Sequence, residues 1–171
     1  HIFDLVRLFF GEVKAVRSLS RPLIVDRIND PTLSTSLHLE SGITVDLVGC
    51  DALYFRIFEM DIIGSKGRLV INNGYDVDYY EVKDSIHNSE FKTLNKAPSP
   101  FPQGREAHYE SAVSNIVSSI TRRERILCNG VDGLKALEVA IAACISYDKK
   151  EEVQLPLKRK YFSTEVKDVL R

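Results

Sequence analysis

The sequence has almost no excess charge of either sign, because 23 Lys and Arg residues stand against 24 Asp and Glu residues in a chain of 171. Proteins that mainly bind nucleic acid usually carry a basic surplus, so the composition argues against that class. Long apolar runs are missing too, and none approaches the ~20 residues that a membrane-spanning helix needs. The hydrophobic share of 44% and the charged share of 27% are ordinary. The totals therefore predict one globular domain, large enough to bury a core.

Cysteine is scarce, and its three occurrences, Cys50, Cys128 and Cys144, are far apart and form no C-x-x-C pair. Their odd number and wide spacing argue against a disulfide framework and against a zinc site. The sequence also lacks the basic, apolar and small-residue pattern of a secretory signal. We therefore expect three buried thiols in a cytoplasmic protein.

Several motifs that carry chemistry are missing. The sequence contains no G-x-G-x-x-G, no G-x-x-x-x-G-K-[ST] and no G-x-S-x-G. The four histidines are His1, His38, His87 and His108, and none belongs to an H-E-x-x-H pair, so no metal site is predicted. Gly64-Ser65-Lys66-Gly67 would suit a phosphate, but it joins two predicted strands and is typical of a hairpin turn.

The first residues have the pattern of an amphipathic helix. In HIFDLVRLFF apolar residues recur at helical spacing, Gly11 ends the run, and residues 12–18 alternate like a strand. No Ser, Thr, Asp or Asn precedes this helix to cap it. Chain termini are usually exposed and frayed. We therefore expect this chain to be one part of a longer protein.

Short strands are predicted over much of the chain. We expect them at 36–40, 43–47, 55–63, 68–71, 75–82 and 152–155. Turn residues separate them, most clearly Asn72-Asn73-Gly74, because Asn and Gly tolerate positive φ. Strands joined by such turns pair as antiparallel hairpins. Residues 20–31 are predicted to be a polar connection, and residues 84–104 a loop of about twenty residues.

The long strand predicted at 55–63 carries large apolar side chains on both faces. Met60 and Ile62 point one way, while Phe55 and Ile57 point the other. A sheet with one solvated face should instead alternate cleanly. We therefore expect the second face of the sheet to meet another subunit or another domain.

Two helices are predicted, at 106–123 and from 129 to about 147. The first ends among Arg122, Arg123 and Arg125, which suit the C-terminal end of a helix dipole. The second is expected to bury a stripe formed by Leu134, Leu137, Ala140, Ile141 and Cys144. Together the elements predict an α+β fold, with a largely antiparallel, open-faced β-sheet and helices packed on one face.

His1 and Asp4 form the one pair whose spacing suggests acid–base chemistry. They lie one helical turn apart and so share a face of the predicted helix. A neutral imidazole, with an ordinary pKa of about 6.5, can take a proton from a hydroxyl at neutral pH. A carboxylate one turn away can orient it. The alternatives are an ordinary histidine at a helix start and a residue of a purification tag.

Three stretches, taken in order, resemble the glucose–fructose oxidoreductase/inositol dehydrogenase (Gfo/Idh/MocA) family. HIFDLVRLFFGEVKAV resembles the H-x-x-D-x-x-x-x-x-x-G segment that opens the family's C-terminal domain. EMDIIGSKGRL resembles its E-x-x-I-x-G-(S/T)-x-G-x-L hairpin. NGVDGLKALEV, continued by AACIS and VQLP, is similar to the closing pattern of that domain. The resemblance runs from His1 to Pro156.

The resemblance implies that residues 1–171 are a single domain, which binds substrate and forms the oligomer of a longer oxidoreductase. An N-terminal Rossmann domain, absent from this sequence, would hold NAD or NADP. His1 matches the family's catalytic histidine, which lies beside the substrate hydroxyl and the nicotinamide, and Asp4 matches the aspartate that follows it, with an orienting or structural role. The family's Glu-Lys-Pro lysine would lie upstream, so this chain alone is expected to bind no cofactor and to be inactive.

The substrate implied by the resemblance is a sugar, a cyclitol or a nucleotide-sugar, oxidised at a carbinol carbon. Tyr54, Arg56 and His38 are further candidates for contact with it, because they are polar groups on predicted strands. A second copy of the chain, bound through the open sheet face, is the other expected partner. Neither nucleic acid nor membrane is expected.

Two readings from other classes stay open. One is a free-standing, non-catalytic α+β module for dimerisation or ligand binding. The other is a hydrolase built on His38 or His108, although the sequence positions no nucleophile near either.

Overall fold

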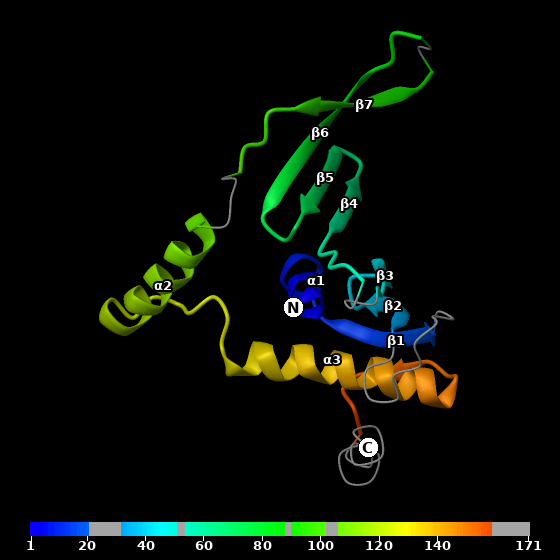
Figure 1. The fold of residues 1–171 in the computed structure, drawn as a ribbon, viewed down its shortest axis with the longest axis vertical. Helices are drawn as coiled ribbons and strands as arrows, with labels where there is room; N and C mark the ends of the chain where they lie inside the picture. Colours follow the sequence, from blue (N-terminus) through cyan, green and yellow to red (C-terminus); the bar gives the residue numbers. More distant parts are fainter. Residues whose placement is uncertain (21–31, 51–53, 88–89, 102–105, 159–171) are drawn as a thin grey trace. The chain divides into compact units, whose positions relative to one another are not determined.

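The computed structural model describes residues 1–20, 32–50, 54–87, 90–101 and 106–158, which divide into two compact units (Figure 1). Unit 1 consists of His1–Phe55 with Cys128–Arg171, and unit 2 of Arg56–Leu127. The connection predicted at 20–31 lies, from residue 21 on, outside the described residues.

Unit 1 combines an antiparallel sheet with two helices. Its elements are α1 (Ile2–Phe10), β1 (Val13–Ser20), β2 (Leu33–Leu39), β3 (Thr44–Val48), α3 (Gly130–Lys149) and β8 (Val153–Gln154). The four strands form sheet A in the order β3-β2-β1-β8, and every pairing is antiparallel. The opening helix, the strand after it and the hairpin of β2 and β3 confirm the predictions for those segments.

The core of the described residues lies in unit 1, where α3 packs on β1 (Figure 1). Val16, Leu37 and Ala142 are each 0% exposed. Each fully buried large apolar side chain contributes roughly 1.5–3 kcal/mol to folding. The Ser18 amide donates to the Ser146 hydroxyl at 2.9 Å, and that hydroxyl donates to the Glu151 carbonyl at 2.5 Å. These bonds join the helix to the sheet at a buried point.

The face that α3 buries differs from the prediction. Leu134 and Leu137 are 63% and 57% exposed. The buried residues of the helix are Val139, Ala142, Ala143, Ile145 and Ser146. Positions two residues apart are about 200° apart around a helix, so this face is nearly opposite the predicted one. Small side chains let α3 approach β1 closely, which explains why the alanine face rather than the leucine face meets the sheet.

Unit 2 holds the second antiparallel sheet and one helix. Its elements are β4 (Met60–Gly64), β5 (Gly67–Asn72), β6 (Asp76–Asp84), β7 (Lys92–Ala97) and α2 (Glu106–Thr121). The strands form sheet B in the order β4-β5-β6-β7. The turn after Asn72 is as predicted, with φ of 53° at Asn73 and 80° at Gly74. The α+β class is therefore confirmed, with the strands divided between two sheets.

Two predictions for unit 2 were wrong. Residues 55–59 are not part of a strand, because their partner β5 ends at Asn72, where the chain turns back. The predicted loop 84–104 contains β7, which pairs with β6 from Asp84 opposite Lys92 to Tyr79 opposite Ala97. The segment KTLNKA has no apolar alternation, and lysines are typical of a strand at the edge of a sheet.

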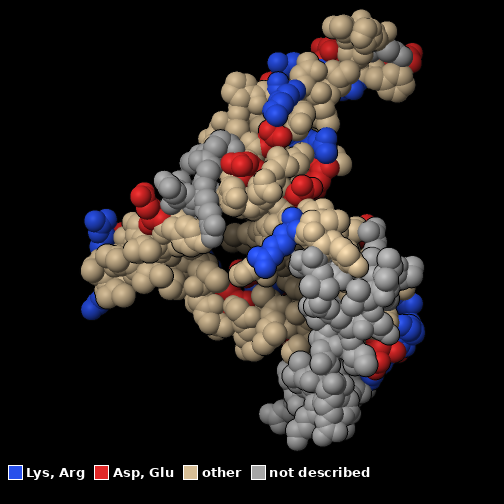
Figure 2. All heavy atoms as spheres, in the orientation of Figure 1, with Lys and Arg blue, Asp and Glu red and all other residues tan. Residues whose placement is uncertain are grey.

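Sheet B has one face of large apolar side chains and a second face, here called the charged face, where ion pairs lie among Ile63, Val70 and Tyr80. Apolar groups therefore lie on both faces, as expected. Directly paired residues of neighbouring strands share a face. One face carries Met60, Ile62, Leu69, Ile71, Val77 and Tyr79. The other carries Arg68 paired with Asp61 and Lys96 paired with Asp78. Figure 2 shows acidic and basic side chains next to one another over these strands.

The apolar face of sheet B is not covered by α2. The apolar residues of this helix remain open, with Val113, Val117 and Ile120 exposed to 60%, 52% and 76%. No described residue of unit 2 is fully buried. The unit therefore shows a sheet face and a helix stripe that are both only half covered.

The cysteines are less buried than predicted. Cys50 and Cys128 are exposed and Cys144 is intermediate. Cys50 follows β3 and Cys128 precedes α3, so both lie in connections rather than in the core. Among the described helices, none combines the length and apolar character that crossing a bilayer requires.

Candidate functional site

His1 is the N-cap residue of α1. Its carbonyl accepts the Leu5 amide at 3.1 Å, which forms the first hydrogen bond of the helix. The imidazole is exposed and makes no capping bond. A helix of nine residues is marginal by itself, so the position of His1 depends on how α1 is anchored to the rest of unit 1.

Two successive residues anchor α1, one apolar and one charged. Val6 is 0% exposed, and the side chain of Arg7 is only 6% exposed. The Arg7 guanidinium makes a two-point contact with Glu12, from Nε to Oε2 at 3.1 Å and from Nη2 to Oε1 at 3.0 Å. Such planar, paired bonds are the strong form of a charged contact.

Arg7 also joins α1 to the start of α3. Its Nη1 donates to the Asp132 carbonyl at 3.0 Å and to Asp4 Oδ1 at 3.3 Å. The start of α3 is itself fixed, because the Asn129 side chain accepts from the amides of Val131 and Asp132 and the Asp132 carboxylate accepts from the Asn129 amide. This reciprocal capping gives Arg7 a rigid partner.

Asp4 contacts Arg7 and Cys128 among the described residues. Its Oδ2 lies 3.8 Å from the Cys128 thiol. Burial, followed by the negative charge of Asp4, raises the pKa of that thiol above its ordinary value. Asp4 makes no hydrogen bond to the His1 imidazole, so its orienting role stays a prediction and would act through the helix.

Glu12 is the carboxylate most affected by this cluster. The hydrogen bonds from Arg7 and then from Lys135, whose Nζ donates at 2.8 Å, lower the pKa of Glu12 to about 2 against the opposing effect of burial. The same Glu12 contact raises the pKa of Arg7. Glu12 is thus ionised throughout the range in which most enzymes work.

Glu12 is expected to make stability depend on pH in the acid range. Its folded pKa lies below its unfolded value, so the stabilisation is complete above about pH 4.5 and is lost as the pH falls toward about 2. The Glu12 side chain is 43% exposed, and solvent screening reduces the effect to about 1 kcal/mol. Glu12→Gln should remove it at pH 7, and the difference from the wild type should become small as the pH falls to about 2.

Urea unfolding followed by circular dichroism at several pH values measures this difference. Glu40→Gln is the matched control, because Glu40 is exposed and its carboxylate forms no hydrogen bond or ion pair with another described residue. Equal pH profiles for the wild type and Glu12→Gln would contradict the prediction.

Of these residues, the sequence indicates His1 and Asp4 as site candidates but not Arg7, Glu12, Asp132 or Lys135. The spacing of Asp4 and Arg7, three apart on a helix, was a usable sign of an ion pair. The contact between Arg7 and Asp132 bridges distant parts of the chain, and no local pattern indicates it.

His38 lies on the face of sheet A opposite the buried side chains of β2. Thr35, Leu37 and Leu39 are buried, whereas His38 is exposed. Its Nδ1 lies 3.3 Å from the Thr44 hydroxyl and its Nε2 lies 3.7 Å from Glu152 Oε2. This face therefore presents imidazole, hydroxyl and carboxylate groups side by side.

Comparison with known proteins identifies the family. Residues 1–155 match the family described as "Oxidoreductase family, C-terminal alpha/beta domain" (GFO_IDH_MocA_C). The chain belongs to this family.

Solved structures share the fold of this Gfo/Idh/MocA C-terminal domain. Levoglucosan dehydrogenase, in complex with NADH and L-sorbose, has a TM-score of 0.70 and 14% identity, over 92% of this chain and 48% of its own. WlbA dehydrogenase from Bordetella pertussis, in complex with NADH and UDP-GlcNAcA, has a TM-score of 0.61 and 17% identity, over 92% and 43%.

A third structure is an oxidoreductase from Agrobacterium radiobacter in complex with NAD+, L-tartaric acid and magnesium, with a TM-score of 0.60 and 18% identity, over 90% of this chain and 46% of its own. This chain thus spans less than half the length of these three proteins.

Tyr54 and Arg56 do not lie on strands of the Gfo/Idh/MocA domain, which corrects the prediction. Both are exposed in the segment that precedes β4, and Tyr54 is 65% exposed. Tyr54 belongs to unit 1, as His38 does, whereas Arg56 belongs to unit 2.

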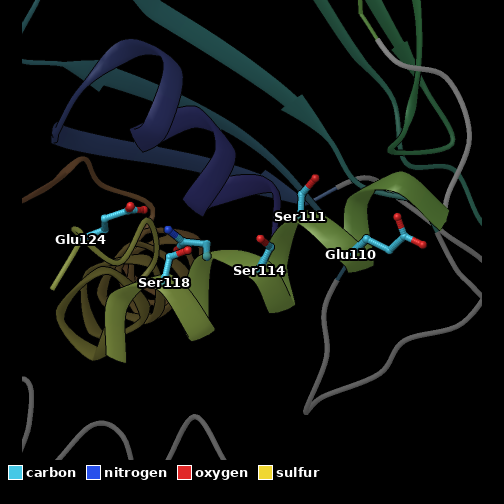
Figure 3. A pocket seen from close by; sticks show the side chains of 6 residues that line it. Glu110, Ser111, Ser114, Ser118 and Glu124 are labelled. Carbon is cyan, nitrogen blue, oxygen red and sulfur yellow. The ribbon is translucent and has the colours of Figure 1, made fainter. Parts of the chain in front are cut away.

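A hollow of ≈ 490 Å³ lies on α2 and is lined only by polar residues. Figure 3 shows Ser111, Ser114 and Ser118 along the helix, between Glu110 and Glu124. Asn115 also lines it and holds the following segment in place by accepting the Leu127 amide at 3.0 Å. The hollow offers hydroxyl and carboxylate groups and contains no imidazole.

Among the described residues, no glycine-rich turn leads from a strand into a helix. Gly67 is required by its neighbour strand instead, since a Cβ there would lie 2.4 Å from the Tyr80 carbonyl oxygen. In the described ranges no three His, Cys, Asp or Glu side chains are grouped as metal ligands.

Proposed function

We propose that this domain binds the substrate and forms the oligomer of a nicotinamide-dependent oxidoreductase that acts on a carbinol carbon of a sugar, cyclitol or nucleotide-sugar. A dinucleotide-binding domain outside this sequence would supply NAD or NADP. The observation that carries the proposal is the match of residues 1–155 to the family of C-terminal oxidoreductase domains. His1, exposed at the start of an anchored helix, is consistent with it.

In this proposal His1 is the base. Its imidazole takes the proton from the substrate hydroxyl, because a carbinol can give up hydride only as that proton leaves. Asp4 has an orienting or structural role, through its contact with Arg7. His38 contacts hydroxyl groups of the substrate, and its neighbours Thr44 and Glu152 are suited to the same task. Tyr54 and Arg56 are the remaining candidates for substrate contact.

The three solved structures with this fold are complexes with NADH and L-sorbose, with NAD+, L-tartaric acid and magnesium, and with NADH and UDP-GlcNAcA. These ligands support the proposed substrate class and the proposed cofactor.

The experiment is to express the whole reading frame that contains this domain and to assay it with NAD+ and NADP+. The panel should hold sugars, cyclitols and nucleotide-sugars, with reduction of the nicotinamide followed at 340 nm. We expect turnover by the whole protein and none by residues 1–171 alone. A start codon immediately upstream of the His1 codon would contradict the proposal and favour a stand-alone binding module.

The oligomer is proposed to form through the apolar face of sheet B. The six large apolar side chains of that face are half-buried in the described structure, and α2 leaves them open. A second copy would cover them and remove them from water, which is the main driving force of association. The charged face carries its own ion pairs, and the proposal leaves it in water.

Two neighbouring residues on β5 test this. Leu69 lies on the apolar face and Val70 on the charged face, opposite Asp61 and Asp78. Leu69→Lys should weaken self-association by at least about tenfold, because it places a charge in the buried interface. Val70→Lys should have no such effect.

Sedimentation equilibrium of the whole protein and both variants measures the association constant. A wild type that is monomeric at tens of micromolar, or equal losses in the two variants, would rule out this interface.

A further inference from the structure

The proposed base His1 has no side-chain bond of its own, so its place is set by the backbone of α1. The helix rises ~1.5 Å per residue, which puts Arg7 ~9 Å along the axis from His1. Arg7 is the most buried charged side chain of the group around it, at 6% exposure against 36% for Asp4 and 43% for Glu12. Burial and its hydrogen bonds therefore restrict the Arg7 side chain to one conformation.

Four hydrogen bonds from one guanidinium fix three different parts of unit 1. They reach Glu12, which precedes β1, then Asp4 in the first turn of α1, and then the Asp132 carbonyl in the first turn of α3. Asp4 is the link toward His1, one turn away. A displacement of Arg7 would therefore move the turn that carries the base.

We propose that Arg7 is a positioning residue for the oxidoreductase reaction, which holds the first turn of α1, and with it His1, against the capped start of α3. This inference rests on the proposed role of His1. Glu12 contributes to this positioning, because its two carboxylate oxygens orient the plane of the Arg7 guanidinium. The first turn of α1 then cannot rotate without breaking paired bonds.

A positive charge at position 7 is not enough to hold the first turn of α1 in this way. Lysine carries the same charge on a flexible stem, but it lacks the planar fork and cannot contact Glu12 at two points and Asp132 at a third. Arg7→Lys therefore keeps the charge balance among Asp4, Glu12 and Asp132 and removes only the geometry. A reacting group displaced by about 1 Å can lose rate by about a hundredfold, so a partial displacement should cost about tenfold.

The chain provides a matched control in unit 2. Arg68 makes the same two-point contact with Asp61, at 2.8 and 2.6 Å, on the charged face of sheet B. Arg68→Lys is thus the same substitution in the same kind of pair, away from α1 in the sequence. It should leave the kinetics unchanged.

The experiment uses the whole protein and two readouts. The first is kcat and KM with a substrate from the panel, for which Arg7→Lys should lower kcat at least about tenfold and leave KM within about twofold. The second, independent of turnover, is hydrogen exchange of the Leu5 amide, whose bond to the His1 carbonyl begins the helix. This exchange should rise at least about tenfold in Arg7→Lys and not in Arg68→Lys.

Unchanged kcat and unchanged Leu5 exchange in Arg7→Lys would overturn the inference, and so would an equal loss of kcat in Arg68→Lys. Should Arg7→Lys fold poorly, Glu12→Gln gives the same test, because it weakens the contact while Arg7 stays in place. His1→Ala separates the two claims. If it keeps wild-type kcat, the proposed role of His1 fails and this inference fails with it, whereas if it loses kcat and Arg7→Lys does not, only the role of Arg7 fails. The absence of turnover by the wild type on the whole panel would instead contradict the proposed function.

Discussion

Replacing His1 by alanine in the whole protein is expected to lower kcat by about 10²- to 10⁴-fold, the usual contribution of a positioned general base. KM should change by less than about threefold, because the imidazole acts on a proton rather than as a main binding contact. The measurement is steady-state oxidation of the best substrate of the panel at several pH values. The acid limb of the pH profile that a base produces should disappear together with the rate.

His87→Ala is the control for this experiment. His87 is exposed beyond the end of β6, where its backbone amide bonds to the Ser85 hydroxyl. The substitution removes an imidazole of the same kind from a place with no proposed role. If His1→Ala retained more than a third of the wild-type kcat, the base would have to be another residue.

Leu37→Ala is expected to have the largest effect on stability, a loss of about 3 kcal/mol. Leu37 is 0% exposed at the centre of sheet A, where it lies opposite Val16 on β1 and Val45 on β3. Its removal would leave a cavity that its neighbours cannot fill, since α3 is held to β1 by fixed bonds. The lost contacts and the cavity both add to the cost.

The matched control is Leu19→Ala in the same sheet. Leu19 is 59% exposed, so its truncation should change the free energy of unfolding by less than about 0.5 kcal/mol. Urea unfolding of both variants, followed by far-ultraviolet circular dichroism, measures the difference. Equal effects of the two substitutions would mean that Leu37 does not lie in the stabilising core.

The sequence predicted those elements whose formation depends on nearby residues. The helix α1 follows from the spacing of Leu5, Val6 and Phe9 and ends at Gly11, where φ is 95°. The turn at Asn73-Gly74 follows from residues that accept positive φ. Residues 55–59 have strand-like residues but no partner to pair with, and β7 has a partner but a polar sequence. Whether a segment forms a strand depends on a partner elsewhere in the chain, and this explains why the predictions for residues 55–59 and for β7 were wrong.

The site was predictable to a similar degree. The spacing of His1 and Asp4 suggested them as candidates, which stay a prediction, and the family was identified from motifs spread over the chain. The sequence gives no sign that Arg7 is buried, because an arginine on a short helix is usually solvated. Its burial results from Glu12 and from the start of α3, which meet it only in the folded chain.

The buried contact between α3 and β1 explains the structural role of one motif of this family. Ala143 and Ser146 belong to the A-x-x-S part of the closing pattern, and both are almost fully buried where helix and sheet meet. A single Ser146 oxygen accepts from one layer and donates to the chain that leads to β8. The A-x-x-S motif therefore holds the helix against the sheet. A protein of this fold can keep the motif unchanged even when the substrate that it binds is different.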